Sequence, residues 1–268
     1  LVASYIGYKS KKQVVTVSGA TKTEVILVED ATQLEDVVVT GVINPRSKLQ
    51  SSVSISSVST AQIEQAAPRA TAEIFRSIPG IKSESTGGEG NANITIRGIP
   101  VASGGAKFLQ IHEDGLPVMQ FGDVAFGNAD IFVRADQTIS RIEAIRGGSA
   151  STLASNSPAG IINFISKNGK TEGGSLMQSF GVDFDNYRTD FEYGSPIGNG
   201  LFFHVGGFYR QGEGPRNAGY TANVGGQLKA NITKEFENGF VRLYFKHLID
   251  RALGYGPMPV RVSGTNSN

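Results

Sequence analysis

The stretch that decides the fold reads ISRIEAIRGGSASTLASNSPAGIINFISK and occupies residues 139–167. Isoleucines recur in residues 141–146 and 160–166, and such β-branched runs favour strands. Two glycines follow the first run, and the small residues 149–154 favour a helical turn before the second strand begins. Short strands mixed with short helices predict a small α+β domain around this stretch.

Three shorter motifs precede this stretch. Residues 73–81 (EIFRSIPGI) indicate a helix that a Pro-Gly pair ends. Residues 93–100 (NITIRGIP) indicate a strand that runs into an Arg-Gly pair, and residues 109–118 (LQIHEDGLPV) indicate a hairpin that turns at Asp-Gly. One short motif is weak evidence for a fold. Four such motifs in a fixed order over about a hundred residues are strong evidence, because each supports the structural context of the others.

Together the four motifs resemble the plug domain of TonB-dependent outer-membrane receptors, whose closing segment follows the pattern IERIEVLRGPxSxLYGxxAxGGxINIxTK. The positions that match are Ile142, Glu143, Arg146, Gly147, Ser149, Ala150, Ser151, Gly160, Ile162, Asn163 and Lys167. The departures are Gly148, where proline is usual, and Leu-Ala-Ser at 153–155, where Leu-Tyr-Gly is usual. The resemblance implies a plug seated in the lumen of a large membrane β-barrel.

The hydrophobic pattern changes after residue 173. Residues 187–193, 222–232 and 241–246 alternate apolar and polar side chains, with weaker alternation in 176–182 and 201–210. Segments of roughly ten alternating residues are typical of membrane barrel strands, whereas a soluble β-sandwich is the alternative. We expect residues 175–249 to form consecutive antiparallel strands. Plugged transporters have about 22 strands, so about five strands indicate a fragment.

The expected fold is therefore an α+β plug domain followed by antiparallel transmembrane β-barrel strands of an incomplete barrel, with a short all-β N-terminal remnant. Residues 1–32 resemble the end of a carboxypeptidase regulatory-like β-sandwich, and a generic β-meander is the alternative. The expected boundaries continue with a TonB box and linker at 33–57, the plug at 58–168 and the barrel strands at 172–268. Leu1 falls inside an apparent strand and no basic signal-peptide region precedes it, so we expect the start to be truncated.

Composition excludes several classes of function. The net charge is +1 over 268 residues, which gives no electrostatic case for binding nucleic acid. Ser149 and Ser151 lack credible His–Asp partners, and the Gly-Gly-Ser stretch lacks the ending of a P-loop, so we expect no enzyme and no cofactor. His112 and Glu113 are neighbours on a predicted strand and point to opposite faces, so we expect no metal site.

The resemblance assigns the TonB box to Asp36, Val37, Val38, Val39 and Thr40. Three β-branched valines suit an extended segment that adds to the edge strand of a partner, because main-chain hydrogen bonds give such pairing its affinity. The Ser-rich run after it reads as a linker and supports the box. The alternative is an ordinary strand of the preceding sandwich.

Two further sets of residues are candidates for contacts. The resemblance implies plug–barrel contacts for Arg97, Glu143 and Arg146. A pairing role also fits their chemistry, because a charged side chain on an apolar strand is costly unless it is paired. The alternative is that these charges are solvated on an exposed strand. The outward loops of such plugs touch substrate, so Phe121 and Phe126 are the candidates for substrate binding. The same two rings could instead seal the plug against the barrel.

These observations lead to two functional hypotheses. The first is TonB-dependent active transport of an iron chelate, haem, cobalamin or oligosaccharide across the bacterial outer membrane. Its partners would be TonB with its inner-membrane energising complex, outer-membrane lipid and the substrate, and the N-terminal part and plug would be reachable from the periplasm. The second is a non-transporting outer-membrane ligand receptor or signal-transducing barrel. Uptake that collapses with the proton gradient separates the two.

Overall fold

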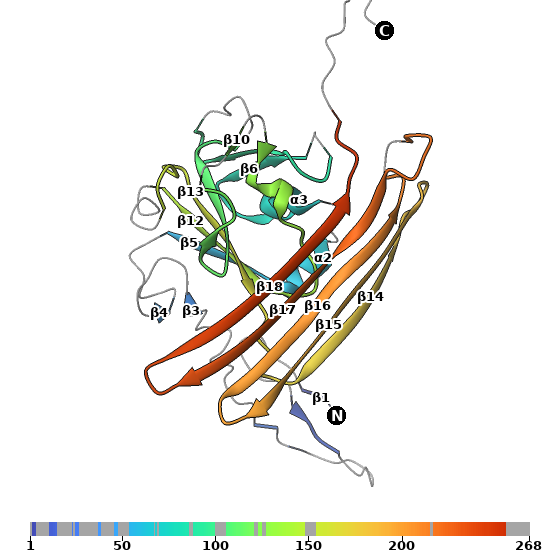
Figure 1. Cartoon of the computed structure of the whole chain (residues 1–268). Coiled ribbons are helices and arrows are strands. Elements are labelled where there is room, and N and C mark those ends of the chain that lie inside the picture. The colour runs from blue at the N-terminus through green and yellow to red at the C-terminus, as the bar shows by residue number, and fades with distance from the viewer. Residues whose placement is uncertain are drawn as a thin grey trace, which may run out of the picture.

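The structure is a computed structural model, and most of the residues that it describes form two parts. Residues 54–166 form a small domain of short strands and helices, and residues 173–251 form a sheet of long strands, called the wall below. The small domain lies against one face of the wall (Figure 1). The described residues are 2–3, 11–14, 23, 25–26, 37–38, 46–47, 54–66, 68, 70–85, 88–99, 106–120, 123–124, 127–147, 154–214 and 217–255.

A five-stranded sheet organises the small domain. Its strand order is β5-β12-β13-β8-β9, and only β13 and β8 pair in parallel. The two strands predicted at 141–146 and 160–166 are present as its central pair. The bounds are β5 Ile55–Ser59, β12 Ile139–Arg146, β13 Gly160–Ser166, β8 Leu109–Glu113 and β9 Leu116–Pro117.

The predicted helix before the Pro-Gly pair is present but shorter than expected, and another helix precedes it. Helix α2 spans Thr60–Ala66 and begins with a capping box, in which Gln62 Oε1 accepts from the Ser59 backbone N–H at 2.9 Å. Helix α3 (Thr71–Ile74) continues as a 3-10 turn η2 (Phe75–Ser77). The tighter turn ends the helix before the Pro-Gly pair, because proline restricts the backbone of the residue before it.

The remaining elements of the small domain are short. Strands β6 (Ile81–Glu84) and β7 (Asn93–Ile96) pair antiparallel, as do β10 (Asp123–Val124) and β11 (Gly127–Asn128). A 3-10 turn, η3 (Ala129–Phe132), follows. The predicted Asp-Gly hairpin joins β8 to β9, with positive φ at Asp114 (49°) and Gly115 (86°), which is the geometry of a type I′ turn.

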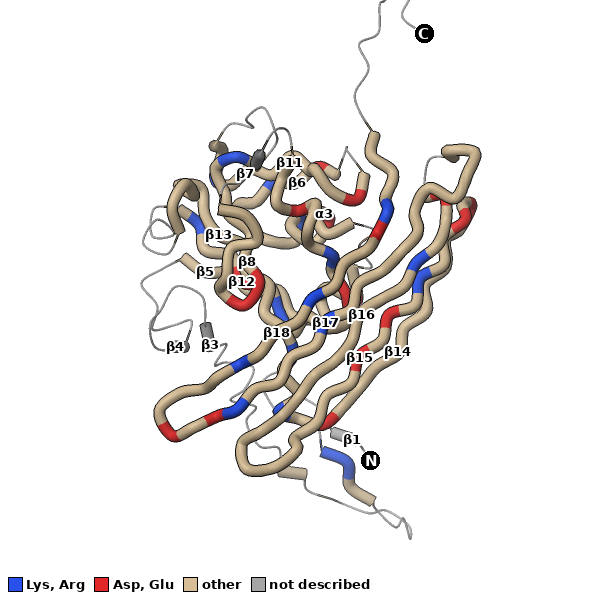
Figure 2. The backbone as a smooth tube through the Cα atoms, viewed as in Figure 1, with Lys and Arg blue, Asp and Glu red and all other residues tan. Residues whose placement is uncertain are grey.

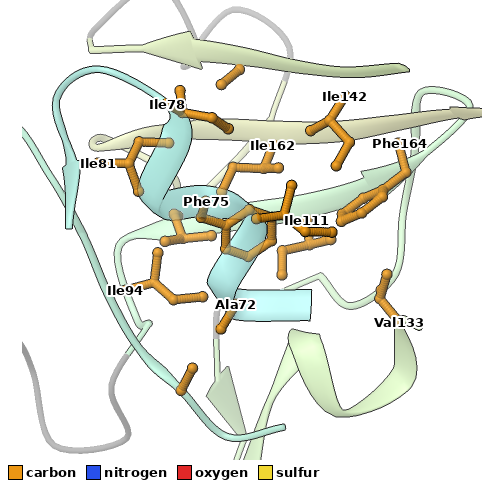
Figure 3. Close-up of a cluster of buried hydrophobic side chains, with 14 of the residues drawn as sticks. Ala72, Phe75, Ile78, Ile81, Ile94, Ile111, Val133, Ile142, Ile162 and Phe164 are labelled. Atoms are coloured by element: carbon orange, nitrogen blue, oxygen red, sulfur yellow. The ribbon is translucent and has the colours of Figure 1, made fainter. Parts of the chain in front are cut away.

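The core of the small domain lies between its sheet and helix α3. Phe75 is fully buried and meets Phe164 edge to face, with ring centroids 6.0 Å apart. Isoleucines from β12, β13 and β8 surround the two rings (Figure 3). Burying each large side chain stabilises the fold by about 1.5–3 kcal/mol, so this cluster is what makes the small domain a folded unit.

The wall is an antiparallel meander, as predicted for residues 175–249. Its strand order is β14-β15-β16-β17-β18. Two-residue turns join β15 to β16 and β17 to β18, and longer loops join the strands at the other end, called the loop end below. The bounds are β14 Gly173–Phe180, β15 Asn186–Gly198, β16 Leu201–Gly212, β17 Asn223–Phe236 and β18 Gly239–Arg251.

Each wall strand presents a polar face and an apolar face. On β17, Gln227 and Lys229 are buried beneath the small domain, whereas Leu228 and Ile232 point away from it and are about 40 % exposed. The predicted alternation is therefore present, and its polar side meets the small domain. None of the described helices has the length and apolar composition required to cross a membrane.

Few residues before Ser54 are described. Strand β1 (Val2–Ala3) pairs antiparallel with β2 (Lys11–Lys12), and β3 (Val37–Val38) pairs antiparallel with β4 (Arg46–Ser47). The rest of the expected N-terminal sandwich and linker lies outside the described residues, so the proposed boundaries at 32 and 57 stay predictions.

Candidate functional site at the seam between the small domain and the wall

The wall presents its charges to the small domain in rows across the strands, because paired residues of neighbouring strands stand side by side. The loop-end row contains Arg188, Arg210 and Asp250, which follow one another through the strand registers. The middle row contains Glu192, Lys229 and Lys246. Figure 2 shows basic and acidic positions along these strands where the small domain meets the wall.

A four-residue ion cluster closes the seam at the loop-end row. Arg210 binds the Asp250 carboxylate through Nε (2.8 Å) and Nη2 (2.7 Å), and its Nη1 binds Glu89 at 2.7 Å. Arg134 of the small domain binds Asp250 at 2.7 Å and lies 3.7 Å from Glu89. All four side chains are at most 8 % exposed. Forked contacts of this kind are strong because both partners are charged.

Arg134 also holds the segment that follows η3. Its Nη1 donates to the carbonyl of Ile131 at 2.8 Å and to that of Val133 at 3.1 Å. These carbonyls lie at the C-terminal end of a helical turn, where the backbone leaves acceptors without partners. One side chain therefore shapes a turn of the small domain and ties that turn to the wall.

A second ion cluster lies at the middle row. Glu113, at the end of β8, contacts Lys229 at 3.1 Å and Lys246 at 2.6 Å. Lys246 also donates to the carbonyl of Phe132 at 2.8 Å. Nearer the two-residue turns, Asp114 lies 3.5 Å from Arg242. In these contacts the small domain supplies the acid and the wall supplies the base.

Segment 135–138 joins the two clusters. Gln227 donates to the Asp136 carboxylate at 2.6 Å, and Arg188 donates to the carbonyl of Ala135 at 2.6 Å. Arg188 also pairs with Asp190 of its own strand at 2.7 Å. The segment is therefore hydrogen-bonded to the wall through side chain and backbone alike.

Lys167 marks the exit from the small domain. Its ammonium group lies 3.0 Å from Glu192, which also meets His204 at 2.8 Å. Its carbonyl accepts from Asn231 at 2.9 Å. The chain is thus fixed to the wall just before it enters β14.

Two carboxyl groups of the seam are held in the charged form. Burial alone would raise the pKa of Glu113, but the charges of Lys229 and Lys246 outweigh it and leave the pKa below its ordinary value. Burial would likewise raise the pKa of Asp136, but Lys229 and the hydrogen bond from Thr138 bring it below its ordinary value. Both acids therefore stay ionised at neutral pH and keep their contacts.

Asp130 behaves in the opposite way. Its carboxylate accepts from the backbone N–H groups of Asn91 (3.1 Å) and Ala92 (3.0 Å), which ties the segment around Glu89 to η3. Burial raises the pKa of Asp130 despite these hydrogen bonds. Protonation of this one carboxyl therefore favours the folded domain slightly as the pH falls.

We predict that the seam resists mild acid. A carboxyl whose pKa is lowered on folding stabilises the docked state above its ordinary pKa, and that contribution is lost as the pH falls through the lowered value. In liposomes that contain the full-length protein, the part of solute leakage that depends on Glu113 should be absent at about pH 5 and appear only below about pH 4, the ordinary range of carboxylic acids. Buried His112, whose pKa is lowered, acts separately, because its protonation weakens the plug between pH 7 and pH 5.

The matched control for this pH prediction is Glu64→Gln, which removes an exposed acid of α2 and should leave the acid transition in place. Glu113→Gln should remove the part of the transition that depends on Glu113. If the difference in leakage between the unmodified protein and Glu113→Gln changes between pH 7 and pH 5, the lowered pKa of Glu113 is wrong.

The structure brings Arg97 and Arg146 together at one edge of the small domain. Arg146 donates to the carbonyl of Pro79 and, at 3.1 Å, to Ser54 Oγ. A Cβ atom added to Gly147 would lie 2.9 Å from Arg97 Nη1, so this glycine gives the guanidinium room. Arg146 Nε is buried and has no hydrogen-bond partner among the described residues. The barrel contacts proposed for both arginines stay predictions.

Glu143 lies inside the small domain's sheet. It is 1 % exposed and accepts from Arg141 Nε of the same strand at 2.8 Å. Its proposed contact with the barrel stays a prediction.

Several proposed site residues fall partly outside the description. Val37 and Val38 form β3 and are extended, and Asp36, Val39 and Thr40 lie outside the described residues. Phe121 and Phe126 lie outside them as well. The predicted roles in TonB binding and substrate binding therefore stay predictions.

The histidine that prompted the metal question is engaged within the protein. His112 Nε2 lies 2.9 Å from Gln110 Oε1, and burial lowers the His112 pKa. In the described part of the chain, no group of three His, Cys, Asp or Glu side chains is placed to hold a metal ion.

Sequence reasoning missed most of the charged seam. Arg134 and Asp250 were not singled out, and Glu89 lies in the glycine-rich loop 87–91, which suggested contact with substrate and no ion pair. The useful signal was the polar face of each alternating strand. A buried charge needs a partner, so charges on the inner face of a barrel strand predict opposite charges on whatever fills the lumen.

Comparison with known proteins agrees with the fold. Residues 47–161 match the family model of the TonB-dependent Receptor Plug Domain. The vitamin B12 transporter BtuB of Vibrio vulnificus (strain CMCP6) is 26% identical over 160 residues, which cover 59% of this chain and 25% of that protein. The chain thus spans about a quarter of the length of this curated relative.

Solved receptors share the arrangement of both parts. The alcaligin outer-membrane receptor FauA of Bordetella pertussis matches with a TM-score of 0.56 and 18% identity over 81% of this chain and 36% of that one. The pyoverdine receptor FpvA of Pseudomonas aeruginosa PAO1 matches with a TM-score of 0.60 and 17% identity over 75% and 28%. At these identities the likeness shows the fold.

The fold is that of a plug domain seated against strands of an outer-membrane receptor barrel. The chain carries the plug and barrel-type strands of a TonB-dependent receptor. The small domain is called the plug from here on.

Proposed function

We propose that the full-length protein is an energised transporter that carries a small molecule across the bacterial outer membrane. The observation that carries this proposal is the buried ionic seam between a folded plug and the polar face of strands whose other face is apolar. The Asp250 side chain is 0% exposed and lies between Arg134 and Arg210. Ion pairs can be rebuilt after they separate, so such a seam suits a plug that closes a pore and is moved when the pore conducts.

The apolar outer face of the wall supports a location in a membrane. Leu243 and Ile249 on β18 are 70% and 67% exposed, and Leu176 on β14 is 77% exposed. Large exposed apolar patches mark contact surfaces, and apolar-out, polar-in alternation is the pattern of barrels that cross the outer membrane. We therefore place the wall in outer-membrane lipid, with the N-terminal part and the plug reachable from the periplasm.

The substrate class follows from the relatives. The relatives described above are a vitamin B12 transporter and receptors for alcaligin and pyoverdine. We infer a substrate of that size, either a cobalamin or an iron chelate, and TonB as the partner that supplies energy. Uptake of a labelled substrate by cells that carry the full-length protein tests this. Uptake that survives collapse of the proton gradient would favour a receptor that does not transport.

We predict that Val38→Pro abolishes energised uptake. Val38 lies in the extended strand β3, which pairs with β4, and the TonB box is proposed to pair with TonB through backbone hydrogen bonds. Proline removes the N–H donor from such a ladder. Uptake should fall at least about tenfold, because one lost backbone bond together with the steric clash weakens strand addition by more than 1.4 kcal/mol.

Val38→Thr is the control for the box, since threonine keeps the donor and the β-branch. This variant should transport normally, and both variants should bind substrate at the cell surface with unchanged affinity. Equal uptake by Val38→Pro and the unmodified receptor would remove the box from residues 36–40.

A further inference from the structure

The two charged rows of the seam differ in how their charges are divided between plug and wall. The rows lie four residues apart along each strand, which is roughly 14 Å at ~3.4 Å per residue. At the loop-end row each surface carries its own counter-ion. The plug holds Glu89 and Arg134, which lie 3.7 Å apart, and the wall holds Arg210 and Asp250, which lie 2.7 Å apart.

At the middle row the charges on β17 and β18 are divided by sign between plug and wall, whereas Glu192 on β15 pairs with Lys167 at the exit of the plug. The plug contributes Glu113, and the wall contributes Lys229 and Lys246 opposite it. Asp136 is a second acid of the plug, and the positive charge of Lys229 lowers its pKa. Glu113 reaches both lysines at 3.1 Å or less, and in the described part of the chain neither lysine forms an ion pair with an acid of the wall.

This difference sets how readily each row can open. Separating the loop-end surfaces leaves two neutral pairs, because Arg134 can keep Glu89 and Arg210 can keep Asp250. Separating the middle-row surfaces leaves two lysines on the wall and two carboxylates on the plug without their partners. Leaving a buried charge without its partner is strongly destabilising, so the middle row resists opening far more than the loop-end row.

We propose that the plug swings on a hinge, anchored at Glu113 with Lys229 and Lys246, and opens first at the cluster of Glu89, Arg134, Arg210 and Asp250. The proposal rests on the transport function proposed above and names the positioning residues for its opening step. The cluster that opens includes Glu89, which follows directly on the Gly88 bridge to Gly254 beyond β18. A ligand that moves this loop would therefore withdraw Glu89 from the cluster that it helps to hold shut.

The decisive comparison is between one variant at each row, in the full-length receptor reconstituted in planar lipid bilayers. Glu113→Gln keeps the shape of the anchor and removes its charge. Arg210→Gln combined with Asp250→Asn removes the neutral wall pair and leaves Glu89 with Arg134. Ion conductance is recorded first in buffer and then with stepwise urea, without TonB and without substrate.

We expect Glu113→Gln to raise the open fraction in buffer at least about a hundredfold, since a buried pair loses one partner. The double variant at the loop-end row should stay closed in buffer, within about threefold of the unmodified receptor, because it leaves no uncompensated charge. It should open at a lower urea concentration than the unmodified receptor.

A third variant guards against simple misfolding. Glu113→Gln with Asp136→Asn, Lys229→Met and Lys246→Met removes both carboxylates and both lysines of the middle row, and replacing a whole buried ion cluster by uncharged groups is often neutral. It should return conductance in buffer to within about threefold of the unmodified receptor. A closed Glu113→Gln variant, a double variant that conducts as freely as Glu113→Gln, or a quadruple variant that stays open would each overturn the hinge. Conductance requires neither TonB nor substrate, so a failed uptake assay would refute transport and leave the hinge intact.

Discussion

Phe75→Ala should strongly destabilise the plug while leaving the wall intact. The Phe75 ring is fully buried and packs edge to face on Phe164. Truncating such a ring costs about 3–5 kcal/mol, from lost transfer free energy and from the cavity that remains. A small domain has only about 5–15 kcal/mol of stability in total, so this loss is a large fraction of the whole.

Native-state hydrogen exchange in the full-length receptor measures this effect. Amides of β13 in the plug should exchange at least about a hundredfold faster in Phe75→Ala, as expected for a loss above 3 kcal/mol, whereas amides of β16 should not change. Phe132→Ala is the matched control, since Phe132 is 50% exposed and its loss should stay within about 1 kcal/mol. Unchanged exchange in β13 would show that the core of Figure 3 does not hold the plug together.

Arg97→Ala combined with Arg146→Ala should loosen the plug and raise leakage of small solutes. Both guanidinium groups gather at the edge formed by the Pro79-Gly80 turn and Gly147. Arg97 has a φ of +50°, which is uncommon for a side chain with Cβ and indicates that the surroundings hold it there. The family resemblance places barrel carboxylates opposite both residues, and truncating one side of such pairs costs about 3–5 kcal/mol.

Antibiotic sensitivity of cells that express the variant receptor reports this leakage. Each single substitution should give a smaller effect than the pair, because the remaining arginine still has its place at the edge. Lys107→Ala is the control, since it removes an exposed positive charge from the same domain. If the double variant neither leaks nor changes uptake, the two arginines are ordinary surface charges.

Local patterns predicted much of the fold. The period-two alternation of residues 187–193 placed Arg188, Asp190 and Glu192 on one face, and the structure turns that face toward the plug. The Asp-Gly hairpin and the capping box of α2 were predictable for the same reason, since neighbours in sequence determine both.

The seam was not predictable in the same way. Its contacts join residues that lie far apart in the chain, such as Glu89 with Arg210 and Glu113 with Lys246, which are 121 and 133 residues apart. No periodicity links such partners. The sequence shows that a strand carries charges on its inner face, and only the packing of one domain on another shows which charges meet.

The order of strands in the plug sheet has a consequence for how the protein reaches its folded form. Ser59 of β5 pairs with Arg141 of β12, and β13 lies parallel to β8 about 50 residues earlier. Pairing strands that lie far apart in the chain is slow, because the entropy cost of closing the long loop precedes the stabilising contacts. The wall strands, by contrast, pair only with their sequence neighbours. During synthesis and export the plug segment therefore stays without its sheet until residue 166 has arrived, and hairpins of the wall can form while the plug is still an open chain.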